Sequence, residues 1–331
     1  CQYGIFNSFF SIGGGVMMTA FFMLSGFSLY YTNIERNEYK NAADIFKFYK
    51  KRIIGIIPLY WFIALTYPVN EIMNGGNLVR NILLAPIEFL GLQTLFHSIY
   101  GLTHNGGTWF VSCLLISYFG FPYYFEIIKQ MNMKVKAAVE IILGIILIYS
   151  AFMAEYLEVE ATYANPIFRT FEFIMGMVLC AIWMEIKEKA SYKKWCAKWL
   201  QPILCFIILV VFLTIAIDHY DVFPASFPGI YMIYSGICLP IFVWLIICSA
   251  GLKSERLKNM KLFHYVNELC FSLFLAQFYT WTFALKCLTY TGSGNITRIV
   301  VVLIMWFVLA VGMHEIIEKP CKRILNKILK C

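Results

Sequence analysis

The sequence predicts an all-α fold, a polytopic integral membrane helix bundle with nine transmembrane helices. Three observations support this prediction: the composition, the length of the apolar runs and the placement of the cations. Hydrophobic residues make up 60% of the 331 positions and charged residues 14%, whereas a soluble domain has about 45–50% and about 25%. The apolar runs approach the ~20 residues that cross the ~30 Å hydrocarbon core of a bilayer. A single water-soluble core could not bury this much apolar material.

The predicted spans follow one another along the whole chain. A basic cluster at 50–52 precedes the second span, which is typical of a helix that enters the membrane from the cytoplasm. The segment 73–107 contains Pro86 and Glu88, and we interpret it as an outer re-entrant or interfacial segment, with a full span as the alternative. The spans are 10–32, 53–72, 108–128, 136–154, 166–186, 201–217, 229–250, 266–288 and 296–317.

The distribution of Lys and Arg predicts the orientation. Alternate connections between the spans hold 23 of the 27 Lys and Arg residues, and cytoplasmic loops are enriched in these cations. One connection on the opposite side is acidic instead, with Glu155, Glu158 and Glu160. We therefore expect a multi-pass cell-membrane protein with a cytoplasmic C-terminus. The net charge of +8 reflects the same sorting, so no nucleic-acid partner is expected.

Local sequence patterns occur in the order found in one known family. They are VMMTAFFMLSGFSLYY, FYKKRIIGIIPLYW, GTWFVSCLLISYFGFPYY, NPIFRTFEFIMGM, CFSLFLAQF and IIEKP. In this order they resemble the helices of the acyltransferase-3 family of integral membrane acyltransferases, over nearly the whole chain. Family members usually have one more helix at the start. We therefore expect residues 1–331 to form a single acyltransferase domain, N-terminally truncated, whose first helix is absent.

The resemblance implies transfer of an acyl group, usually acetyl, from cytoplasmic acyl-CoA to a hydroxyl of an extracytoplasmic or lipid-linked saccharide. Acetyl-CoA is then a co-substrate, and the saccharide acceptor and membrane lipids are the other partners. No bound cofactor is expected, and no metal, because the 11 cysteines form no CxxC pair. The rival interpretation is a glycan or lipid transporter or flippase. Such folds often contain internal repeats, and the sequence shows none.

Several family features are missing from the sequence. Gly55 replaces the second Arg of one motif, Leu114 replaces a Glu, and Gln277 replaces a His. The Arg and His of the family's first helix, its usual catalytic candidates, have no counterpart. The roles of these groups cannot be transferred to the residues that replace them.

Donor-binding candidates lie at the start of the second span. Lys51 and Arg52 can pair with phosphates, Arg as a planar fork and Lys as a point charge. The alternative is topological anchoring against anionic lipid. The resemblance favours Arg52 for the donor role. Tyr60 is an aromatic residue that could stack on adenine or a sugar, with placement at the membrane interface as the alternative.

Catalytic candidates are predicted on the outer side. Arg169 and Glu172 are three residues apart on one helix face, and they form either a mutually neutralised structural pair or part of the acceptor side. Acyl transfer to a hydroxyl also needs a base, which a His can supply. His104 is the best candidate, because NGGTW would bring it to the mouth of a helix. His264 and His314 lie near predicted cytoplasmic ends.

Overall fold

The computed structural model describes residues 4–34, 39, 41–73, 75–95, 108–156, 163–195, 198–218, 230–252, 260–291 and 295–329. Within these residues the fold is helical and contains no strand. The elements are α1 (Gly4–Asn33), α2 (Ala42–Met73), α3 (Leu78–Phe89), α5 (Trp109–Gln130), α6 (Met133–Tyr156), α7 (Pro166–Ile186), α8 (Ala190–Trp195), α9 (Leu200–Asp218), α10 (Ile230–Ala250), α12 (Lys261–Thr291), α13 (Asn295–Gly312), η2 (Met313–Glu318) and α14 (Lys319–Ile328). Each predicted span falls on one of the long helices, so the all-α class is confirmed for the described residues.

Length and composition identify part of the fold as apolar enough to lie in a bilayer. Among the described residues, three helical stretches are long and apolar enough to cross a membrane: Trp109–Gln130, Pro166–Ile186 and Val300–Ile328. Leu200–Leu213 and Tyr234–Ala250 are shorter apolar helices. These helices fit a membrane protein. The count of nine spans stays a prediction.

The chain forms two compact units, and the first comprises Cys1–Lys40 and Cys113–Lys253. Its core joins α1, α6, α7, α9 and α10 through buried apolar side chains that include Val16, Met23, Leu147, Met175, Leu179, Leu209, Cys238 and Phe242. Residues three, four or seven apart on one helix contribute to this core, which is the spacing of a helix face. The apolar runs read from the sequence thus provide the packing faces of this unit.

Two glycines set the close approach of α1 and α7 in this unit. A Cβ atom added to Gly26 would lie 1.9 Å from the carbonyl oxygen of Phe173, and one added to Gly176 would lie 1.8 Å from that of Met23. Only a residue without a side chain allows two helix backbones to approach this closely. The contact therefore fixes α7, and with it the buried polar residues of its first turns, against α1.

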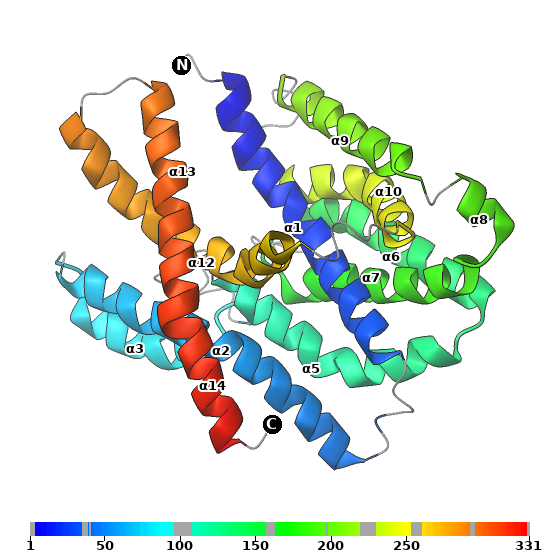
Figure 1. Ribbon diagram of the computed structural model, residues 1–331, viewed down its shortest axis with the longest axis horizontal. Coiled ribbons are helices and arrows are strands. Elements are labelled where there is room, and N and C mark those ends of the chain that lie inside the picture. The colour runs from blue at the N-terminus through cyan, green and yellow to red at the C-terminus, as the bar shows by residue number, and fades with distance from the viewer. Residues whose placement is uncertain are drawn as a thin grey trace. The chain divides into compact units, whose positions relative to one another are not determined.

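The second unit comprises Asn41–Ser112 and Ser254–Cys331. In this unit α12 packs along α13, and α2 contacts α3, η2 and α14. Figure 1 shows α13, η2 and α14 (orange to red) as one continuous rod. The middle of that rod, η2, is a π-helix of six residues, and π-helical turns occur frequently at functional sites.

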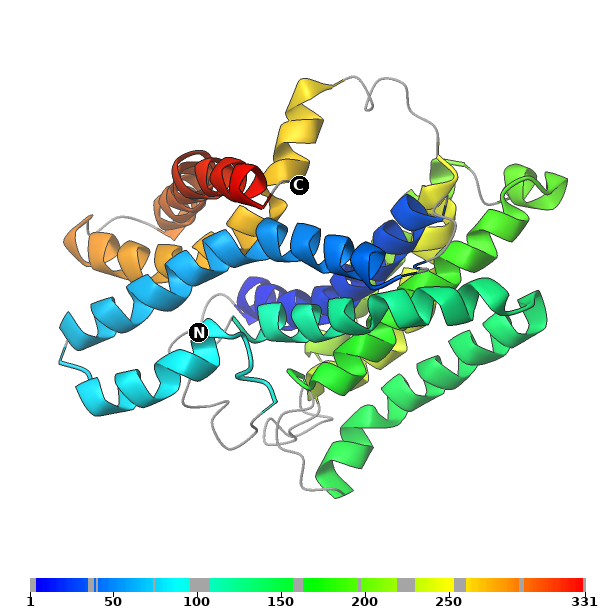
Figure 2. The same cartoon turned by 90° about the horizontal axis from the view of Figure 1, so that it is seen from below.

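Helix α3 covers part of the predicted outer segment 73–107. It begins after Asn77, whose Oδ1 accepts a hydrogen bond from the N–H of Arg80 at 3.1 Å, and the chain turns after it at Gly91, which has a φ of 68°. Figure 2 shows α3 (cyan) folded back along the end of α2. Its 12 residues extend about 18 Å, which is less than the ~30 Å hydrocarbon core. Helix α3 alone therefore cannot cross the bilayer, and its re-entrant or interfacial position stays a prediction.

Candidate functional site

The residues predicted for the site fall into three groups. Arg169 and Glu172 lie on α7 in the first unit, while Lys51, Arg52 and Tyr60 lie on α2 in the second. The predicted base, His104, is outside the described residues. The structure thus brings Arg169 and Glu172 into direct contact, and it places the donor candidates along a single helix.

Arg169 and Glu172 form a completely buried ion pair. Nη1 of Arg169 donates to both carboxylate oxygens of Glu172 at 2.8 Å, and the side chains are 0% and 1% exposed. Thr19 on α1 bridges the pair, because its Oγ1 donates to Glu172 at 2.7 Å and accepts from Arg169 at 3.1 Å. The Nε of Arg169 donates to the carbonyl oxygen of Tyr163 at 2.8 Å. Side-chain and backbone groups of the protein therefore hold both charged groups of the pair.

The local sequence explains why this pair forms. Asn165 caps α7 by accepting from the N–H of Ile167 at 2.9 Å, and Pro166 occupies the first turn, where its missing N–H costs nothing. Glu172 lies three positions after Arg169, so the two side chains share one face. That face meets α1, and the spacing and the helix contact together produce a mutually neutralised pair. A role in acceptor binding stays a prediction for both residues.

Arg52 and Lys51 occupy different faces of α2. Phe48, Ile56, Leu59 and Ile63 form the buried stripe of this helix, and Arg52 lies on the same stripe, with its guanidinium carbon 5.5 Å from the centre of the Phe48 ring. Arg52 is accordingly half-buried, whereas Lys51 is exposed. The structure thus separates the two adjacent cations that the sequence placed in one cluster.

Tyr60 joins α2 to the end of α3. Its ring is 0% exposed, and its hydroxyl donates to the carbonyl oxygen of Glu88 and lies 3.4 Å from Oε1 of Gln93. Gln93 in turn donates to the carbonyl oxygen of Thr108 at 2.9 Å. These contacts make Tyr60 a packing residue of the second unit. Its predicted contact with a donor stays a prediction, and it would require the ring to become exposed.

A buried polar cluster around Glu318 was missed by the sequence analysis. Oε2 of Glu318 accepts from Oγ of Ser272 at 2.6 Å and lies 2.7 Å from Nδ1 of His314. Lys322 donates to the other oxygen, Oε1. Ser272, His314 and Glu318 are 0%, 4% and 2% exposed. The cluster therefore ties α12, η2 and α14 together around one carboxylate.

The imidazole of His314 is held by a carboxylate at only one of its two ring nitrogens. One ring nitrogen faces Glu318, and among the described residues the other, Nε2, has no hydrogen-bond partner; Oε2 of Glu268 lies 3.8 Å from it. An imidazole held by a carboxylate is the usual arrangement of a general base. The sequence signal was the His-x-x-x-Glu spacing that ends at the Glu of IIEKP. It was outweighed there by the position of His314 near a predicted helix end.

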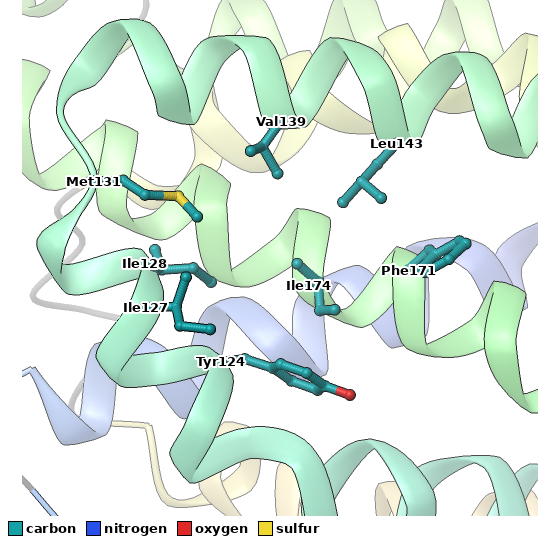
Figure 3. A pocket seen from close by; sticks show the side chains of 8 residues that line it. All are labelled: Tyr124, Ile127, Ile128, Met131, Val139, Leu143, Phe171 and Ile174. Atoms are coloured by element: carbon teal, nitrogen blue, oxygen red, sulfur yellow. The ribbon is translucent and has the colours of Figure 1, made fainter.

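An apolar pocket lies in the first unit between α5, α6 and α7, with a volume of about 230 Å³. Figure 3 shows that its lining side chains come from both sides of the α5–α6 turn and from α7. They are Tyr124, Ile127, Ile128, Met131, Val139, Leu143, Phe171 and Ile174. None of them is charged, so this pocket offers no group that would hold a phosphate.

Comparison with known proteins gives one positive finding. The sequence pattern of a family described as an acyltransferase domain matches residues 2–315. No curated protein and no solved structure matches the chain. The matched range includes Lys51, Arg52, Arg169 and His314, whereas Glu318 and all of α14 lie beyond it.

Proposed function

Because the chain belongs to the acyltransferase-3 family, we propose that it is a membrane O-acyltransferase that moves an acyl group, expected to be acetyl, from cytoplasmic acyl-CoA to a saccharide hydroxyl. The single observation that carries this proposal is the family match over residues 2–315. The acceptor is an extracytoplasmic or lipid-linked saccharide. In this reaction the acceptor oxygen attacks the thioester carbonyl, the carbon–sulfur bond breaks, and the hydroxyl proton passes to a base.

The proposed arrangement in the membrane uses nine spans with the C-terminus in the cytoplasm. The coincidence of each predicted span with a helix supports it, as does the location of 23 of the 27 Lys and Arg residues in alternate connections. In this arrangement the start of α2 and the whole of α14 face the cytoplasm. The first turn of α7, with Arg169, lies toward the outer side.

We assign the donor to the cytoplasmic start of α2. Arg52 is half-buried on the packed face of the helix, and Lys51 is exposed beside it, so we expect Arg52 to chelate a donor phosphate and Lys51 to add charge. On the acceptor side we assign Arg169, Glu172 and the base His104. The assignment of His104 rests on sequence alone.

The test of the proposed function is acyl transfer by membranes that contain the full chain. Incubation with acetyl-CoA and saccharide should release free CoA thiol only when the acceptor is present. Arg52→Gln should weaken acetyl-CoA binding by about tenfold, since charged hydrogen bonds are worth about 1.5–3 kcal/mol, and Lys51→Gln should weaken it less. Acceptor uptake into sealed vesicles without thiol release would instead identify a transporter and refute the proposal.

A further inference from the structure

The second unit contains two basic helical segments. Helix α2 contacts both η2 and α14, and the start of α2 and the end of α14 lie toward the same end of this unit in Figure 1. The cations of these two segments are Lys47, Lys50, Lys51 and Arg52 on α2, and Lys319, Lys322, Arg323 and Lys327 on α14. Segments far apart in the sequence therefore place like charges on neighbouring helices.

The acidic residues of η2 are already paired. Glu318 accepts from Lys322, and Glu315 accepts from Lys319 at 2.7 Å. Among residues 42–52, the acidic residue is Asp44. No ion pair with a described residue is formed by Lys47, Lys50, Lys51, Arg323 and Lys327. The charges of these five cations are therefore not compensated by an ion pair within the part of the chain that the structure describes.

We propose that α14 forms a second wall of the phosphate-binding surface for the acyl-CoA donor, opposite the wall provided by α2. This inference rests on the proposed function and extends it to a helix beyond the family match. Like charges on packed helices repel, and a ligand with several phosphates removes this repulsion while bridging the two helices. Arg323 supplies a planar fork for a phosphate, and Lys327, one turn further along, supplies a point charge.

The buried cluster around Glu318 explains how α14 is held for this task. Ser272 on α12 and His314 on η2 both contact Oε2 of Glu318, the last residue before α14. Both carboxylate oxygens of Glu318 have partners, because Lys322 donates to Oε1, and contacts of this charged kind hold the start of α14 in place. Arg323 and Lys327, which lie beyond it, are exposed. The cluster is thus the support, and the exposed cations are the contact surface.

Phosphate groups could reach this surface from two sources, the donor or anionic lipid headgroups. Ile324 and Ile328 are exposed at 56% and 67% on the same helix, so a helix lying on the bilayer surface is the competing arrangement. The experiment must separate these sources. It uses the full chain in nanodiscs of phosphatidylcholine alone, and in a second set that also contains phosphatidylglycerol, with CoA itself as the probe.

The variants are Arg323→Gln with Lys327→Gln, and Lys319→Gln as the matched control on the same helix. In neutral nanodiscs the double variant should bind CoA about tenfold more weakly or worse, since two charged contacts are lost. Lys319→Gln should bind as the parent does, because Lys319 is paired with Glu315. The charge-retaining pair Arg323→Lys with Lys327→Arg should keep most of the affinity, which controls for misfolding.

The other outcomes overturn the inference in distinguishable ways. Unchanged CoA affinity in the double variant, together with a loss in Arg52→Gln, would refute the role of α14 and leave the proposed function intact. A defect confined to nanodiscs with phosphatidylglycerol would assign α14 to lipid headgroups. A parent chain that binds no CoA at all would overturn this inference and the donor assignment together.

Discussion

Gly26 of α1 and Gly176 of α7 occupy reciprocal positions, each against the backbone of the other's helix. The first faces the carbonyl oxygen of Phe173 and the second that of Met23, within 2 Å of where a Cβ atom would stand. Neither oxygen is the movable end of a side chain. The two helices must therefore separate if either glycine gains a side chain.

Gly176→Ala should destabilise the protein by about 1–3 kcal/mol, the usual cost of overpacking. Gly144→Ala on α6 is the matched control, because its added Cβ would meet only Cε of Met175 at 3.9 Å. The control should be neutral or stabilising, since Ala favours the helix over Gly. Thermal unfolding in detergent measures both. Equal melting temperatures for the two variants would show that α1 and α7 are not in backbone contact.

The Arg169–Glu172 pair predicts that a single substitution lowers the stability of the protein much more than substitution of both residues does. Glu172→Gln leaves the guanidinium of Arg169 buried without its counter-charge, which costs about 3–5 kcal/mol. Replacement of both residues by Met removes both charges and should recover most of that stability. If the double variant is as unstable as the single one, the pair is not the mutually neutralised unit described above. If it is stable but inactive, the acceptor role gains support.

The cluster around Glu318 predicts that the stability of the protein depends strongly on this one carboxylate. Glu318→Gln keeps the shape but replaces one acceptor oxygen by an NH₂ group, so a donor among Ser272, His314 and Lys322 loses its partner. Unfolding experiments should show a loss of about 1.5–3 kcal/mol per charged hydrogen bond removed. Glu315→Gln, which affects an exposed pair with Lys319, is the control and should change stability less. A larger effect in the control would contradict the importance of the buried cluster.

The orientation predicts which loops a membrane-impermeant thiol reagent reaches. On a background without native cysteines, a single Cys at Glu158 should be modified from outside intact cells, and one at Lys194 should be spared. The reason is the enrichment of cytoplasmic loops in Lys and Arg, and Lys194 lies in such a loop. Labelling of position 194 with protection of position 158 would invert the proposed arrangement.

The apolar runs predicted the positions of the helices more accurately than their ends. The span at 166–186 coincides with α7 because Asn165 and Pro166 provide start signals directly before the apolar run. The span at 53–72 begins well after α2 does, at Ala42. Hydropathy detects only the part of a helix that suits the bilayer, and the helix continues through the polar residues before it.

Contacts between helices could not be predicted from local spacing. The separation of three residues placed Arg169 and Glu172 on one face, but Thr19 comes from a helix 150 residues away from Arg169. In the same way, Ser272 reaches Glu318 from α12 across 46 residues. The burial of Tyr60 and of Arg52 likewise depends on which helices pack against α2. A single sequence contains no pattern that pairs these elements.

The π-helix η2 makes the angular position of α14 depend on one residue. A π-helical turn contains one residue more than an α-helical turn, and an α-helix rotates by ~100° per residue. Deletion of Ile316, which is 76% exposed, would remove this extra residue and leave Arg323 and Lys327 near their present face, whereas conversion of η2 into an α-helix with every residue kept would turn them by ~100° around the axis. The C-terminal helix should therefore tolerate the loss of one residue within η2 far better than the insertion of one residue in α13.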